Sequence, residues 1–182
     1  MIVWADARLN PEGIAQATAL GRFWADAVRR DGLPLPGTVY TSPLARCLET
    51  TRLAFGPVFE EQGAPFRPVV KELLRETVID HTCDRRSPRS WIEANYPSYA
   101  IEPGFSEEDV RWGSRRWETF EGHVARKQTV LEEIFATDEN EVVALTVHSG
   151  ATSAILSVVG SPEFLLREGT SIALLVRADR VE

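Results

Sequence analysis

Short apolar runs alternate along the chain with longer stretches in which apolar residues recur every three or four positions. The runs at 38–42, 67–74, 142–148 and 171–177 predict strands, and a run with no polar alternation is typical of a strand buried on both faces. The amphipathic stretches predict helices at 11–30, 43–55, 106–134 and 150–159. Strands alternating with helices indicate one domain, residues 1–182, with a three-layer α/β/α fold and a mostly parallel sheet.

Helix start signals refine these boundaries. Asn10 followed by Pro11 is typical of an N-cap and first helical position. Ser106 is expected to cap the long helix, because carboxylates in the first turn suit the helix dipole. Its core-facing stripe, one residue in seven, would be Val110, Trp117, Val124 and Leu131. Residues 77–104 are rich in proline, arginine and aromatics and are expected to form an irregular lid over a site.

Composition excludes several functional classes. The 182 residues are 43% hydrophobic and 26% charged, with a net charge of −7. An acidic chain is a poor general binder of nucleic acid or anionic membranes. No apolar run approaches the roughly 18 residues of a membrane span, so a soluble, cytoplasmic protein is expected. Cys47 and Cys83 lie far apart without metal-ligand spacing, so neither a metal nor a cofactor is expected.

The run Val142–Val147 ends at His148, and Ser149 and Gly150 then open a helix. Ligands of open α/β sheets bind beyond the carboxyl ends of strands. A ring nitrogen next to the free amides of a helix start suits an anionic oxygen. Taken alone, His148 is better explained as a hydrogen-bonded core histidine, and Gly150 as a residue that relieves crowding at the helix start.

Arg46 lies in the first turn of the helix that follows strand 38–42. A cation is unfavourable at that end of a helix, so the arrangement favours an anion bound between guanidinium and amides. The alternative is a surface ion pair with Glu49, in the weaker of the two orientations.

Glu76 follows the run Leu73–Leu74. It could donate a proton if the site excludes water from its carboxyl group and so raises its pKa. A solvated glutamate is the alternative. Arg46, Glu76 and His148 follow three different strands. We expect the ends of these strands to converge on one crevice. Nearby, Arg75 and the arginines of 85–89 could attract an anionic substrate or form a solvated loop.

Four motifs resemble the histidine phosphatase superfamily, with its phosphoglycerate mutase-like fold, and more narrowly its fungal branch. Residues 6–17 resemble the entry to the first helix, and residues 41–46 the phosphate-binding Ser-Pro-Leu-x-Arg. Residues 74–76 resemble the segment with the proton-donating glutamate, and residues 147–150 the second histidine motif. The resemblance implies hydrolase or isomerase (mutase) chemistry, with catalytic roles for Glu76 and His148. It implies a phosphate site at Arg46, His148, Ser149 and Gly150.

The family's nucleophilic histidine belongs to an Arg-His-Gly motif at the end of its first strand, and this sequence contains no such motif. Covalent catalysis needs its nucleophile, so hydrolysis of phosphomonoesters is not expected. Three explanations remain open. The chain could be a truncated phosphatase, a binding or structural protein, or an acid–base enzyme (lyase, cyclase or isomerase) acting on a small anionic metabolite.

The same resemblance has consequences for assembly. In the resembled fold the first strand is central, between the strand ending at His148 and strand 171–177, and here we expect it to be truncated or missing. Unpaired backbone in the interior costs about 1–3 kcal/mol per group. The flanking strands must therefore pair directly, or Met1–Trp4 or a second copy must fill the gap. A homodimer is favoured.

Overall fold

The computed structural model describes residues 5–113, 117–162, 164 and 166–179. The described elements follow one another as α1 (Pro11–Asp31), β1 (Thr38–Thr41), α2 (Ala45–Glu61), β2 (Val69–Val70), η1 (Glu72–Leu74), η2 (Thr82–Asp84), α3 (Arg89–Asn95), β3 (Ala100–Ile101), α4 (Phe120–Thr137), β4 (Val143–Thr146) and α5 (Ser149–Val158). Here η marks a single turn of 3₁₀-helix. This order of alternating strands and helices is the predicted α/β class.

The described strands form one sheet in the order β3-β2-β1-β4, and every pair is parallel. Strand β1 is paired on both edges, with Tyr40 opposite Val69 on one side and Leu145 on the other. Parallel strands place their carboxyl ends along one edge of the sheet. The residues that follow β1, β2 and β4 therefore lie close together, which is what brings the candidate site into one place.

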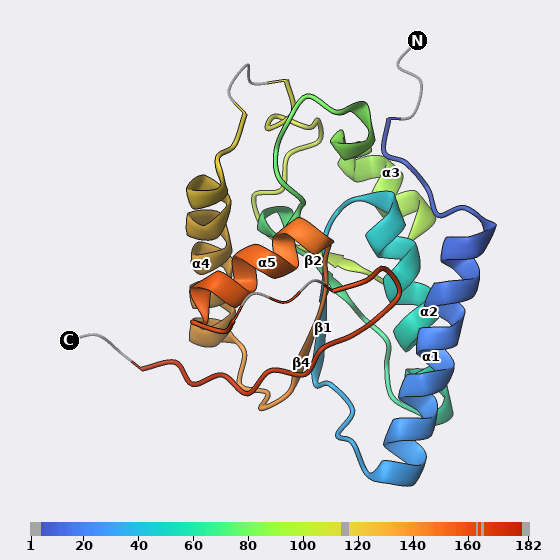
Figure 1. The fold of residues 1–182 in the computed structure, drawn as a ribbon. Coiled ribbons are helices and arrows are strands. Elements are labelled where there is room, and N and C mark those ends of the chain that lie inside the picture. Colours follow the sequence, from blue (N-terminus) through green and yellow to red (C-terminus); the bar gives the residue numbers. More distant parts are fainter. Residues whose placement is uncertain (1–4, 114–116, 163, 165, 180–182) are drawn as a thin grey trace.

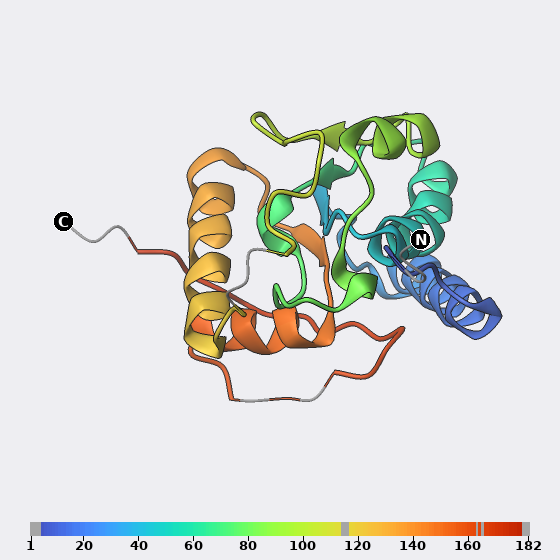
Figure 2. The same ribbon diagram turned by 90° about the horizontal axis from the view of Figure 1, so that it is seen from above.

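Helices cover both faces of the sheet, which confirms the three layers (Figures 1 and 2). On one face α1 and α2 pack over Val39, with Phe55 and Phe59 in the same cluster. On the other face α4 packs over Tyr40, with Val130 and Ile134 in contact. In both views α5 lies on the α4 side of the sheet and adjoins α4.

Helix α1 begins as predicted. The Asn10 side chain accepts a hydrogen bond of 2.8 Å from the Gly13 amide, and Pro11 is the first helical residue. Helix α2 extends past the predicted end at Phe55. Gly56 and Pro57 lie inside it, and the chain turns away only after Glu61.

The helix predicted from Ser106 is wrong over about its first half. The described helix begins at Phe120, where the Thr119 hydroxyl accepts from the Gly122 amide. Instead of lying in a helical turn, the Asp109 carboxylate accepts from the Trp112 amide and binds buried Arg75. The prediction that Val110 and Trp117 face the core is also wrong, since they are 73% and 70% exposed. The buried part of the stripe lies within α4.

The predicted strand 171–177 is also wrong: residues 171–179 form no strand and lie exposed. A β-prone segment becomes a strand only where a neighbouring strand offers backbone partners. Within the described residues β4 is an edge of the sheet, with β1 as its partner. The tail runs past this side of the sheet below α5 (Figure 1). Direct closure between 142–148 and 171–177 is thus wrong.

Two other ways of covering the β4 edge, by Met1–Trp4 or by a second copy of the chain, stay as predictions. Met1–Trp4 lies outside the described residues. A homodimer would be detected by sedimentation velocity as a species of twice the chain mass. No helix in the described part of the chain is long and apolar enough to cross a membrane.

Candidate anion site at the carboxyl ends of the strands

Three predicted site residues meet at one cavity. Arg46 comes from the first turn of α2, Glu76 follows η1, and His148 stands between β4 and α5. All three, with Ser149, line a cavity of about 820 Å³. The cavity continues between the sheet, α1 and the tail 166–176, where its lining is mainly apolar.

His148 is held by two polar partners. The Arg46 Nε–H donates to its Nδ1 across 3.2 Å, and Ser42 Oγ lies 2.9 Å from its Nε2. Because Nδ1 accepts, the ring proton of the neutral form lies on Nε2 and is donated to Ser42. Burial, and then the Arg46 charge, lower the pKa of His148 well below its usual value. The imidazole is therefore a neutral hydrogen-bond donor at physiological pH.

Arg46 makes no ion pair with Glu49, which instead pairs with Arg52. Its Nη2 binds Asp84 at 2.7 Å, and its Nη1 donates to the Cys83 carbonyl. These contacts orient the guanidinium toward His148. They use three of its five N–H donors, which leaves two for another acceptor.

Glu76 occupies the start of α5. Its Oε2 accepts from the Gly150 amide at 3.0 Å, so this carboxylate takes the place that an anion would take at a helix N-terminus. A Cβ on residue 150 would lie 2.4 Å from Glu76 Oε1. Gly150 is therefore required for the close approach of Glu76, and its predicted role as an anion-binding amide is already filled by this internal carboxylate.

Asp6 does the same at the start of α2. It is buried, its Oδ1 accepts from the Ala45 amide at 2.7 Å, and its Oδ2 accepts from Ser87. The α2 amides were expected to bind an external anion, and Asp6 already occupies one of them. The cation at the α2 start is explained by the surrounding carboxylates of Asp6 and Asp84.

Lys127 and Arg126 hold the backbone before Glu76. Lys127 Nζ donates to the carbonyls of Leu73 and Arg75, each at 2.6 Å, and Arg126 donates to the Glu76 carbonyl. Burial lowers the pKa of Lys127 to about 6. No sequence pattern indicates this role, because both residues are charged positions of a helix about 50 positions away.

Cys47 lies next to His148, with 3.3 Å between Sγ and Nε2. A cysteine beside a histidine suggests a nucleophilic pair. Burial, however, raises the pKa of the Cys47 thiol to about 12, so the thiolate is not available at neutral pH. The prediction that Cys47 is a small buried side chain, rather than a nucleophile, agrees with this environment.

The arginines in and just before segment 77–104 are used internally. Arg75 is 1% exposed and pairs with Asp109 and Glu72, and Arg86 also pairs with Glu72. Neither of the alternatives considered for them, a solvated loop or an attraction for substrate, describes these two side chains.

Comparison with known proteins agrees with this architecture. Residues 1–168 match the histidine phosphatase superfamily (branch 1). A probable phosphoglycerate mutase of Arthroderma benhamiae is 44% identical over 178 residues, which are 98% of this chain and 53% of that protein. Phosphomutase-like protein 3 of Candida albicans is 29% identical over 177 residues, 96% of this chain and again 53% of that protein. The chain thus spans about half the length of these relatives.

A mycobacterial glucosyl-3-phosphoglycerate phosphatase has a similar fold, with a TM-score of 0.55 and 21% identity over 87% of this chain and 71% of that one. The chain belongs to the histidine phosphatase superfamily. Within it, the chain is phosphoglycerate mutase-like and has homologues in fungi.

Proposed function

We propose that the chain binds a small anion bearing a phosphate group in the pocket formed by Arg46, His148 and Ser149, with the Glu76 carboxylate lining the same cavity. The contact between Arg46 Nε and His148 Nδ1 carries this proposal, since both residues line one cavity. A permanently charged guanidinium and a neutral Nε2–H give two kinds of donor to one group of oxygens. Binding requires His148 to exchange Ser42 for the ligand.

Catalysis by the route of the superfamily is not part of the proposal. The sequence contains no Arg-His-Gly, and the one cysteine beside His148 is held as a thiol. Without a nucleophile no phosphoenzyme forms. Simple phosphomonoesters should therefore bind without turnover.

Calorimetric titration with inorganic phosphate tests the binding step. We expect Arg46→Ala and His148→Ala each to weaken binding at least about tenfold, since each removes a donor to a charged oxygen worth about 1.5–3 kcal/mol. Arg52→Ala is the matched control, because Arg52 lies on the same helix with its side chain exposed. Equal binding by all variants would contradict the pocket.

An aryl phosphate assay tests the absence of turnover. We expect no hydrolysis above background. Robust hydrolysis that His148→Ala abolishes would contradict the proposal and require another nucleophile.

A second candidate is acid–base chemistry on a small anionic metabolite. The observation that favours it is that a carboxylate and a neutral imidazole, Glu76 and His148, line the same cavity. Turnover of such a compound that Glu76→Gln abolishes, with phosphate binding preserved, would distinguish it from a purely binding role.

A further inference from the structure

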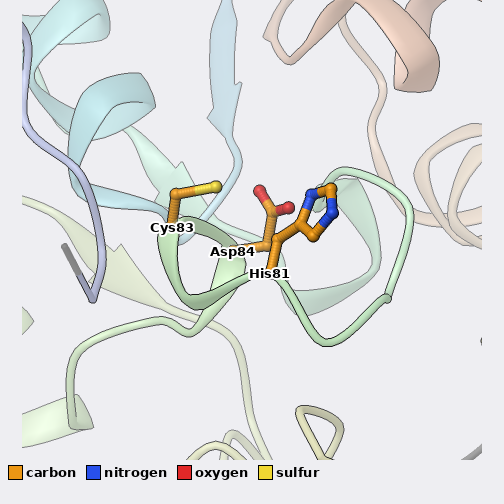
Figure 3. A group of neighbouring side chains, drawn as sticks. All are labelled: His81, Cys83 and Asp84. Carbon is orange, nitrogen blue, oxygen red and sulfur yellow. The ribbon is translucent and has the colours of Figure 1, made fainter. Parts of the chain in front are cut away.

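His81, Cys83 and Asp84 bring three different ligand types together within one turn. Their imidazole, thiol and carboxylate ligand atoms all lie within 4.8 Å of one another. Figure 3 shows the carboxylate between the thiol and the imidazole, on one side of η2. Ligand atoms around a tetrahedral zinc ion are separated by roughly 3.3–3.8 Å, so a small contraction would complete the arrangement.

The backbone of this turn is fixed by side chains from elsewhere. Each of the three carbonyls accepts a hydrogen bond: His81 from Trp112, Cys83 from Arg46, and Asp84 from Arg75. The turn itself is closed by the Asp84 amide, which donates to the His81 carbonyl at 3.0 Å. The three side chains therefore start from a rigid base, which reduces the entropy lost when they bind one ion.

Charge and exposure also suit a cation. Asp84 is buried and its Oδ1 is oriented by Arg46, as a ligating carboxylate commonly is by a hydrogen-bonding neighbour. A carboxylate has a second oxygen for the metal. His81 is exposed and Cys83 partly so, which gives an ion access from solvent.

We propose that His81, Cys83 and Asp84 form a binding site for a divalent transition-metal ion of the zinc class. Thiolate and imidazole select Zn²⁺ and Co²⁺ over Mg²⁺ and Ca²⁺. Three protein ligands leave the fourth position of a tetrahedral ion to water. The cysteine loses its proton to solvent on binding, so the two anionic ligands balance the charge of the ion.

Titration of the untagged, chelator-treated chain with Co²⁺ tests the site by optical absorption. We expect a thiolate-to-cobalt charge-transfer band that saturates at one ion per chain and disappears when Zn²⁺ is added, because zinc binds such sites more tightly. Absence of the band in the unaltered chain would overturn the proposal.

Variants locate the site. His81→Asn and Cys83→Ser should each weaken Co²⁺ binding at least about tenfold, and Cys83→Ser should also remove the charge-transfer band. His81 is exposed, so its replacement leaves the core intact. Cys47→Ser, which removes the other thiol, and Asp80→Asn, which removes an adjacent exposed carboxylate, are the controls and should keep the band. A band lost in Cys47→Ser but kept in Cys83→Ser would place the ion elsewhere and overturn the proposal.

Discussion

The two ends of the sheet differ in how their polar groups are satisfied. At the β2–β3 end, Arg75, Arg86, Glu72 and Asp109 are buried or half-buried, and each is paired with an opposite charge. At the other end, β4 is only partly buried over its whole length and faces an 820 Å³ cavity and an exposed tail. In this chain the charged side chains are enclosed and paired at the β2–β3 end, whereas the β4 end offers room for a ligand or a partner.

Arg75→Ala should have the largest effect. It leaves the Asp109 carboxylate, whose side chain is 2% exposed, without its cation. Breaking a buried pair on one side costs about 3–5 kcal/mol of the free energy of unfolding. Urea denaturation measures this. Arg52→Ala, at an exposed pair, is the control and should cost no more than about 1 kcal/mol. A similar small loss for both variants would contradict the contrast between the two ends.

Lowering the pH should weaken the fold by a smaller amount. Burial lowers the pKa of His123 to about 4, and that of His148 is lowered as well. Between pH 6.5 and 4 the unfolded chain binds these protons and the folded chain does not, so stability falls as pH falls. We expect a loss on the order of 1–3 kcal/mol by urea denaturation across this range.

Two histidine variants check the origin of this pH dependence. His123→Gln should make the loss smaller, and the exposed His81→Gln should leave it unchanged. An unchanged pH profile in His123→Gln would show that other groups cause the loss.

Gly150→Ala should have an effect of about 1–2 kcal/mol, because overpacking of this size is typical where a contact cannot relax fully. The new Cβ would displace the Glu76 carboxylate from the Gly150 amide. Thermal unfolding measures the loss. Gly122→Ala is the matched control, since its Cβ would meet only side-chain atoms at 3.5 Å or more, and it should be neutral or stabilising. If both variants behaved alike, the close approach of Glu76 would not matter.

Sequence patterns predicted the parts of this fold that depend on neighbours in the chain. The apolar runs at β1 and β4 and the Asn10 cap are local signals, and the convergence of Arg46, Glu76 and His148 follows from parallel strands. The predictions that were wrong concern residues whose structure depends on partners far away in the sequence. Asp109 binds Arg75 from 34 positions away instead of supporting a helix. Asp6 caps α2 from 39 positions away. Residues 171–177 have strand propensity but no partner strand among the described residues.

The proposed ligand set at residues 81–84 is not indicated by the cysteine spacing, for a different reason. Searching for metal-ligand spacing between the two cysteines overlooks a His-x-Cys-Asp segment, in which the ligand types differ. A single 3₁₀ turn brings such close neighbours together. The sequence signal of this segment is the presence of imidazole, thiol and carboxylate groups within four residues.

Leu175→Ser should have the smallest effect and tests the β4 end directly. Leu175 is fully exposed in the tail, so it contributes no buried area, and surface substitutions usually change stability by less than about 0.5 kcal/mol. Urea denaturation should give the same midpoint as the unaltered chain and as Ala173→Ser, a control in the same segment. A loss above about 1 kcal/mol would mean that the tail packs against the sheet in solution. The difference between the two ends of the sheet would then be smaller than the structure indicates.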